Sequence, residues 1–153
     1  HQTAAIAVAL KEATTPEFKN YGTQIVKNAK SLAESLTQNG AKLITGGTDN
    51  HLILMDVSPF NLSGKQAEIL LDSIGITVNK NLIPYDTRPP LDPSGIRLGT
   101  PALTTRGFTE NDMVVVGEII SSILKNPEST DVKNKAQQKI KKLTKLHPLY
   151  PEL

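Results

Sequence analysis

The residue in this sequence best suited to chemistry is Arg97, which stands among glycines and apolar residues between Ser94 and Thr100. A guanidinium keeps its charge at physiological pH and needs an anionic or hydrogen-bonding partner. Its planar fork fits a carboxylate through two parallel hydrogen bonds. Arg97 is therefore either an arginine that binds an anionic ligand or one half of a structural ion pair with Asp or Glu.

A second candidate group is Asn79, Lys80 and Asn81, which begin a proline-rich segment that ends at Ser94. Asparagine offers a donor and acceptors that suit a polar heterocycle, but it is also an ordinary turn residue. Four prolines rule out regular helix or central strand over this segment. An ordered loop of this length in a small domain is usually functional. The prolines are Pro84, Pro89, Pro90 and Pro93.

We interpret the other polar candidates in the sequence as structural residues. Asp49, Asn50 and His51 look like a small catalytic or metal cluster, but no second histidine or nucleophile motif accompanies them, so we interpret them as turn and strand-start residues. His147, in a polar tail, suggests no catalytic role. The chain has no cysteine, which excludes thiolate metal sites and a cysteine nucleophile. We predict no metal site, and neither phosphate-loop motif is present.

Composition narrows the possible partners. The formal charge of +2 is too small to indicate nucleic-acid or membrane binding, and no apolar run reaches the roughly 18 residues needed to cross a bilayer. The lack of cysteine fits a cytoplasmic protein. The chain of 153 residues suits one domain. A local basic cluster near the end is best explained as a solvated helix face. It comprises Lys133, Lys135, Lys139, Lys141, Lys142 and Lys145.

The chain begins at His1 without a methionine and continues at once into apolar helical sequence. We expect residues 3–10 to be the end of a buried helix whose start and partner lie outside this chain. Capping signals then predict helices that begin near Pro16, Ser63, Thr109 and Ser129. Apolar residues recur every three or four positions in each of them.

Four short apolar segments predict strands, at residues 41–44, 51–57, 76–78 and 95–100. The second is apolar on both faces, so we expect it to be covered on both sides. Short strands interspersed with helices indicate a small two-layer α/β domain, with a mixed or antiparallel sheet covered by helices.

Four segments together resemble bacterial-type serine hydroxymethyltransferases in order and spacing. They extend over nearly the whole chain, and their joint occurrence is far more specific than any one of them. The end of the chain, Pro148-Leu149-Tyr150-Pro151, also resembles the family's terminus. The segments are Gly46-Gly47-Thr48-Asp49-Asn50-His51-Leu52, Gly75-Ile76-Thr77-Val78-Asn79-Lys80-Asn81, Ser94-Gly95-Ile96-Arg97-Leu98-Gly99-Thr100-Pro101-Ala102 and Thr104-Thr105-Arg106-Gly107-Phe108.

The resemblance implies the small C-terminal domain of a fold-type I enzyme that uses pyridoxal phosphate. Such enzymes are homodimers that interconvert serine and tetrahydrofolate with glycine and 5,10-methylenetetrahydrofolate. Residues 1–14 would then be the end of the helix that links from the large domain, and residues 15–153 the small domain. The cofactor lysine of the family lies upstream in a Thr-His-Lys motif that this chain lacks. We therefore expect no catalysis by this chain alone.

The resemblance also implies roles for individual residues. Arg97 matches the arginine that binds the carboxylate of the amino-acid substrate, and Asn81 matches an asparagine that contacts the folate pteridine. Pro89-Pro90-Leu91 matches a folate-contacting segment that usually reads Ser-Pro-Phe. A hydroxyl and an aromatic ring are lost here, so we expect folate contacts that are weaker or made mostly by the backbone.

Two other interpretations remain open at this point. The chain could be the small domain of another fold-type I enzyme such as an aminotransferase, which also uses an arginine for carboxylates. The segment from Asn81 to Leu91 argues against this. Alternatively, the basic final helix could belong to a non-enzymatic module that binds an acidic partner or RNA, although its apolar residues fall at core spacing.

Overall fold

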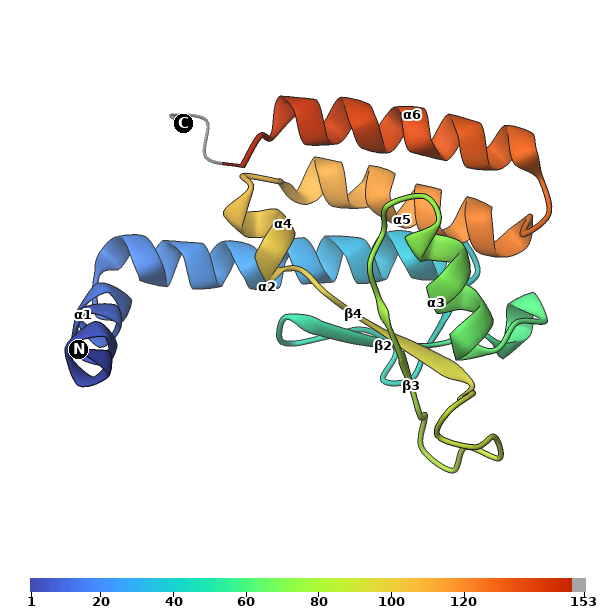
Figure 1. The fold of residues 1–153 in the computed structure, drawn as a ribbon, viewed down its shortest axis with the longest axis horizontal. Coiled ribbons are helices and arrows are strands. Elements are labelled where there is room, and N and C mark those ends of the chain that lie inside the picture. The colour runs from blue at the N-terminus through green and yellow to red at the C-terminus, as the bar shows by residue number, and fades with distance from the viewer. Residues whose placement is uncertain (150–153) are drawn as a thin grey trace.

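A four-stranded antiparallel sheet with helices on one face forms the centre of the computed structural model, which describes residues 1–149 (Figure 1). The spatial order is β1-β2-β4-β3, so β4 lies between two partners. The predicted two-layer α/β architecture with an antiparallel sheet is confirmed. The strands are β1 (Lys42–Leu43), β2 (Leu52–Asp56), β3 (Asn79–Asn81) and β4 (Gly95–Gly99).

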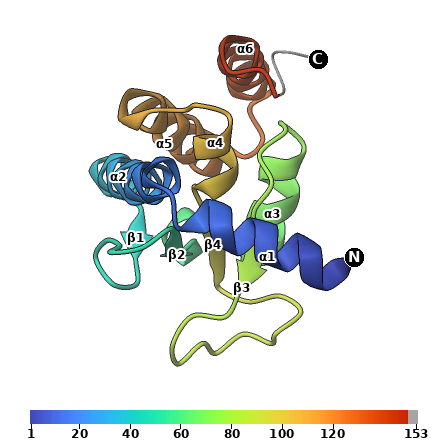
Figure 2. The same ribbon diagram turned by 90° about the vertical axis from the view of Figure 1, so that its left-hand side faces the viewer.

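Helices α2, α3 and α5 cover one face of the sheet, and α6 packs on the outer side of α5 (Figures 1 and 2). Their apolar stripes meet the inward side chains of the strands in one continuous core. The helices are α1 (Gln2–Ala13), α2 (Pro16–Gln38), α3 (Gly64–Asp72), α4 (Pro101–Thr105), α5 (Glu110–Lys125) and α6 (Thr130–Leu146), with a short 3-10 helix at Ser58–Phe60.

The predicted helix starts are confirmed by their caps. Thr15 accepts the backbone N–H of Phe18, and Pro16 occupies the first turn of α2. Ser63 and Gln66 form a reciprocal capping box at α3. An equivalent box opens α5, with an aspartate in place of the usual glutamate. These local interactions satisfy backbone donors that no helical carbonyl can reach.

The sheet differs from the sequence prediction in two places. The third strand comprises Asn79–Asn81 rather than residues 76–78, and it lies at the edge of the sheet, where its pairing with β4 decides its position. The expectation that β2 is covered on both faces is also wrong, because Leu52 is exposed and Leu54 only half-buried. Apolar residues on both faces of a strand therefore do not establish a second covering layer here. Helix α4 was not predicted.

Helix α1 extends away from the rest of the chain, and none of its residues is buried (Figures 1 and 2). Its apolar side chains at Ile6, Val8 and Leu10 are each more than half exposed. The predicted helix is confirmed, but residues 1–149 provide no covering for it.

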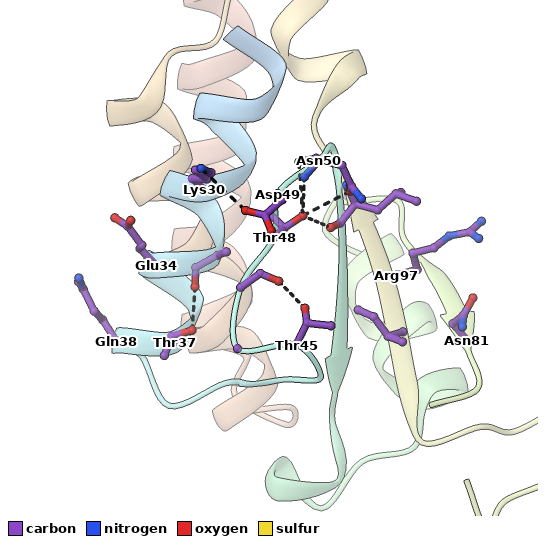
Figure 3. A pocket seen from close by; sticks show the side chains of 15 residues that line it. Lys30, Glu34, Thr37, Gln38, Thr45, Thr48, Asp49, Asn50, Asn81 and Arg97 are labelled. Atoms are coloured by element: carbon purple, nitrogen blue, oxygen red, sulfur yellow. Dashed lines mark hydrogen bonds and ion pairs between the residues drawn. The ribbon is translucent and has the colours of Figure 1, made fainter. Parts of the chain in front are cut away.

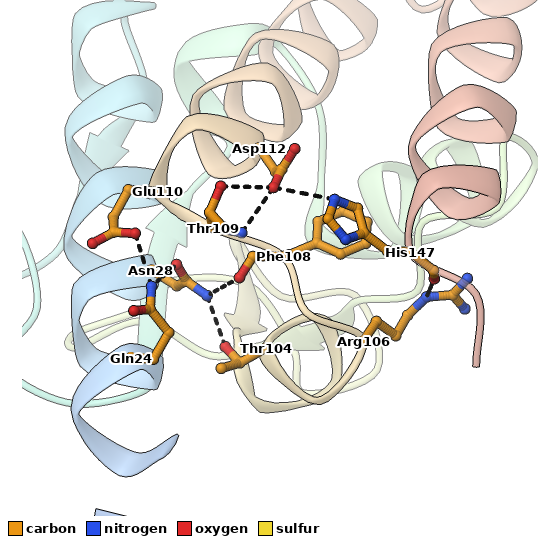
Figure 4. Close-up of polar contacts among 9 residues, drawn as sticks. All are labelled: Gln24, Asn28, Thr104, Arg106, Phe108, Thr109, Glu110, Asp112 and His147. Atoms are coloured by element: carbon orange, nitrogen blue, oxygen red, sulfur yellow. Dashed lines mark hydrogen bonds and ion pairs between the residues drawn. The ribbon is translucent and has the colours of Figure 1, made fainter. Parts of the chain in front are cut away.

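A buried amide, Asn28 on α2, ties this helix to the turn between α4 and α5 (Figure 4). Its Nδ2 donates to Thr104 Oγ1 and to the Phe108 carbonyl, each at 2.9 Å. Its Oδ1 accepts from Gln24. An unpaired buried amide would cost about 1–3 kcal/mol, so these bonds fix α4, and with it the end of β4, against α2.

The end of α6 is hydrogen-bonded to the same turn between α4 and α5. Arg106 Nε donates to the His147 carbonyl at 3.0 Å, and its Nη2 donates to the Thr144 carbonyl at 3.1 Å (Figure 4). The His147 ring packs on Phe108, and its Nε2 lies 3.3 Å from Asp112 Oδ2. Arg106 and His147 therefore hold α6 in place against α5.

Helices α2 and α5 cross closely at Gly117. A methyl group at this position would lie 2.7 Å from Ser35 Cβ. Ser35 is buried, and its hydroxyl donates to the Val114 carbonyl at 2.9 Å. The missing side chain at position 117 allows the two backbones to approach.

We expect Gly117→Ala to lower the free energy of unfolding by about 1–3 kcal/mol, because the added methyl must displace Ser35. Gly22→Ala on α2 is the matched control: nothing lies within 4 Å of its added Cβ, and it should be neutral or stabilise by up to about 1 kcal/mol. Denaturant unfolding measures both. Equal effects of the two substitutions would contradict the close crossing.

Candidate functional site

The alternation of side chains along β4 decides where Arg97 points. Ile96 and Leu98 are buried beneath the helices, so the pleat sends Arg97 to the opposite face of the sheet. There it stands between Leu54 of β2 and Asn79 of β3 in the strand register. No helix of the described chain covers this face, and the Arg97 side chain is exposed (Figure 1).

The carboxylate diagonal to Arg97 on the neighbouring strand belongs to Asp56, and it already has partners. Lys42 Nζ donates to Asp56 Oδ2 at 2.9 Å, and both the backbone N–H and the hydroxyl of Ser58 donate to Oδ1. Burial alone would raise the pKa of Asp56, but these donors from Ser58 and Lys42 hold it below its ordinary value.

Arg97 accordingly forms no ion pair with any carboxylate of residues 1–149. Of the two possibilities for this residue, the structural ion pair is absent from the described chain. An exposed guanidinium on a rigid central strand is free to bind an anion from outside.

Arg97 and Asn81 both line an open pocket of about 950 Å³ (Figure 3). Its remaining lining comes from the exposed side of α2, the turn at residues 45–50, and Leu52 and Leu54 of β2. Figure 3 shows Arg97 and Asn81 on neighbouring strands, on the side of the sheet that faces away from α2. The structure therefore brings together two residues that are separated by the whole proline-rich segment in the sequence.

Asn81 approaches β4 because its partner in the strand register is Gly95. A Cβ at Gly95 would lie 2.6 Å from Ile83 Cγ2 and 2.9 Å from the Asn81 carbonyl, so a side chain there would push the strands apart. The Asn81 Nδ2 donates to the Leu82 carbonyl at 2.7 Å. Its amide oxygen and second N–H remain for a ligand.

Pro89, Pro90 and Leu91 lie on the loop that joins β3 to β4, below the sheet in Figure 1. All three are exposed, and none of them lines the Arg97 pocket. The structure thus places Arg97 and Asn81 together and leaves the Pro89–Leu91 segment at the far side of the loop.

Asp49, Asn50 and His51 form a turn, in agreement with the interpretation from sequence. Asn50 Oδ1 accepts the backbone N–H of Leu52, which orders the entry into β2, while Asp49 is exposed and lies 4.0 Å from Lys30. Among residues 1–149, no three histidine, aspartate or glutamate side chains gather into a metal site. None of the described helices is both long and apolar enough to cross a membrane.

Three lysines near the sheet lie against carboxylates, and one of them, Lys80, is opposite Ile96 in the strand register and so points to the covered face. Lys30 pairs with Asp49, Lys42 with Asp56, and Lys80 with Glu68 at 2.9 Å. The Arg97 guanidinium, which has no carboxylate partner among residues 1–149, is therefore the group at this face that fits an anion.

Sequence reasoning missed two residues that shape the site. In the sequence, Asp56 stands within an apolar strand segment and Asp86 within a proline-rich loop, so neither is apparent as a site residue. An aspartate two residues before Ser58 or Arg88 is a typical turn former, which was the available signal.

Comparison with known proteins gives one consistent result. A family model described as serine hydroxymethyltransferase matches residues 1–120. The serine hydroxymethyltransferase of Methanospirillum hungatei JF-1 is 48% identical over 153 residues, which is all of this chain and 37% of that relative. The chain therefore spans little more than a third of the length of this relative. Tyr150 and Pro151, part of the terminal segment noted in the sequence, lie outside the described residues.

We expect Asp56→Ala to lower the free energy of unfolding by about 1–3 kcal/mol at neutral pH, because Ser58 and Lys42 lose their acceptor. Since the pKa of Asp56 is lowered in the folded state, this contribution disappears as the pH falls below about 4. Urea unfolding between pH 7 and pH 3 should show a steeper loss for the wild type than for the variant. Asp49→Ala, at an exposed carboxylate, is the control and should stay within about 0.5 kcal/mol.

Proposed function

The chain belongs to the serine hydroxymethyltransferase family, and from this premise we propose that it forms the C-terminal part of an enzyme that interconverts serine and tetrahydrofolate with glycine and 5,10-methylenetetrahydrofolate. Residues 1–14 would end the linking helix, and residues 15–153 would form the small domain. The exposed apolar side chains of α1 support this division, because a helix with Ile6, Val8 and Leu10 in water lacks a partner that the rest of the polypeptide could supply.

The observation that carries the proposal is the guanidinium of Arg97, which pairs with no carboxylate of residues 1–149. It projects from a central strand that is paired on both sides, so the backbone that carries it is fixed before a ligand arrives. In the proposed role it donates two parallel hydrogen bonds to the carboxylate of serine or glycine. This contact orients the amino acid without taking part in bond making, and its contribution is to place the reacting carbons.

Asn81 would contact the pteridine of tetrahydrofolate, using the amide oxygen and N–H that the protein leaves unused. The two proposed ligand contacts then lie on adjacent strands and line one pocket. Pro89, Pro90 and Leu91 would meet the folate from the loop, through backbone groups and apolar contact, since the hydroxyl and aromatic ring usual in the family are absent.

Pyridoxal phosphate would be held by the part of the enzyme that precedes this chain. This division of labour is supported by the sequence, which lacks the Thr-His-Lys motif that contains the cofactor lysine in the family. The enzyme would be a cytoplasmic homodimer. The family match argues against an aminotransferase, and the packing of α6 through Ala136 on the core argues against a detached basic module.

In the intact enzyme, Arg97→Ala should lower kcat/KM for serine by about a hundredfold or more, because two hydrogen bonds to a carboxylate are lost. Arg97→Lys should recover only part of the loss, since an ammonium lacks the planar fork. Steady-state kinetics over a range of serine concentrations make the measurement.

Arg106→Ala is the matched control for this arginine. Arg106 binds the end of α6 and lies outside the pocket, so its loss should lower the melting temperature and leave the KM for serine unchanged. Normal serine use by Arg97→Ala at low serine concentrations would remove the basis of the proposal.

We expect the isolated chain to have no hydroxymethyltransferase activity and to form no stable visible absorbance band when pyridoxal phosphate is added. The reason is that the chain lacks the Thr-His-Lys motif in which the family's cofactor lysine lies. Absorbance spectra before and after borohydride reduction, followed by peptide mapping, test this. A reduced cofactor mapped to one specific lysine of this chain would contradict the expectation.

A further inference from the structure

One side chain of the loop at residues 82–94, Asp86, accepts four hydrogen bonds. Its Oδ2 accepts the N–H groups of Ile83 at 3.2 Å and Ser94 at 2.8 Å. Its Oδ1 accepts the N–H of Arg88 at 3.0 Å and the hydroxyl of Ser94 at 2.7 Å. Ile83 and Arg88 lie on the outgoing arm of the loop and Ser94 at its return, so a single carboxylate joins the two arms.

The returning end of this loop is anchored to the body of the domain. The Pro93 carbonyl accepts the N–H of Gly64 at 2.7 Å, at the start of α3, and the Ser94 carbonyl accepts the N–H of Val57 at 3.0 Å, just after β2. The backbone at Ser94 is therefore held in place, and a side chain that hydrogen-bonds to Ser94 is held to the domain through it.

Apart from the packing of the Ile83 side chain beside Gly95 of β4 and the bonds of Asp86, the outgoing arm has local contacts. The Asp92 N–H donates to the Pro89 carbonyl, and Arg88 pairs with Asp92 at 3.6 Å. Both interactions stay within the arm. Within the described chain, the bonds between Ser94 and the Asp86 side chain are thus the hydrogen bonds that join residues 83–92 to the anchored end of the loop.

The local conformation of the loop would not persist by itself. Tyr85 has φ of +58°, a left-handed conformation that side chains other than glycine disfavour, and its ring is fully exposed. No packing of the ring offsets this cost. The Asp86 N–H donates to the Ile83 carbonyl at 3.1 Å and closes the turn around Tyr85, and the Asp86 carboxylate reinforces this turn by accepting the Ile83 N–H.

The ionisation of Asp86 suits this role at all physiological pH values. Partial burial would raise the pKa of its carboxyl, but the donors from Ser94, Arg88 and Ile83 lower it far below its ordinary range. The charged form, which can accept all four bonds, therefore persists from neutral pH well into acid.

We propose that Asp86 is a positioning residue, which pre-forms the loop so that Pro89, Pro90 and Leu91 are presented to tetrahydrofolate beyond Asn81. This inference rests on the proposed function. A loop that is ordered in advance loses little conformational entropy when the ligand binds, whereas a mobile loop must be ordered at the expense of affinity. Asp86 thus sets the affinity for the folate substrate, while Arg97 on its strand sets the affinity for the amino acid.

The test compares Asp86→Ala, Asp86→Asn and Ser94→Ala in the intact enzyme with cofactor bound. Asp72→Ala, at an exposed aspartate on the last turn of α3, is the matched control. We expect Asp86→Ala to raise the KM for tetrahydrofolate about tenfold or more and to leave the KM for serine within about twofold. Asp86→Asn and Ser94→Ala, which each keep part of the bonding, should give smaller changes in the same direction.

Hydrogen–deuterium exchange without folate provides a readout independent of activity. Exchange in residues 82–92 should become faster in Asp86→Ala, and exchange in β4 should stay unchanged. Unchanged loop exchange, or faster exchange with an unaltered folate KM, would overturn the inference. So would equal increases of both KM values. A wild-type enzyme that turned over serine without dependence on tetrahydrofolate would count against the proposed function instead, and the exchange result would still decide whether Asp86 orders the loop.

Discussion

The structure depends on one constraint: β4 is a central strand with a single covered face. Successive side chains of a strand point to opposite faces, so burying Ile96 and Leu98 under the helices obliges Arg97 to face the open side. Pairing with β2 and β3 along both edges then fixes the backbone from which Arg97 projects. A charged residue between apolar ones is thus a consequence of the packing and not an irregularity in it.

The residues after β4 keep this strand in place. Thr100, fully buried, donates through Oγ1 to the Ile25 carbonyl of α2 and through its N–H to the His51 carbonyl before β2. Asn28 then holds the turn after α4. These polar contacts have few alternatives in a dry interior, so they specify one arrangement of α2, α4 and β4. The geometry of the open face of the sheet therefore depends on contacts made on the covered side.

The two proposed substrates would be bound by different kinds of structural element. The amino-acid carboxylate would meet a guanidinium on a central strand, where small displacements are costly. The larger folate would meet an edge strand and a loop, where the family pattern is already altered at Pro89 and Leu91. A loop closed by one carboxylate would tolerate substitution at its surface, because the residues that shape it differ from those proposed to contact the folate.

By itself, the sequence determined the helices other than α4, the caps that begin them and the exceptional position of Arg97, because these depend on neighbours within a few residues. It also indicated the family, through four short segments in order. Only the tertiary structure decided that Asp56 is engaged by Lys42 and Ser58, that the third strand is Asn79–Asn81, and that Asp86 closes the loop. These features depend on strand register and on contacts across a folded loop. Such pairings join residues distant in the chain, and no local propensity encodes them.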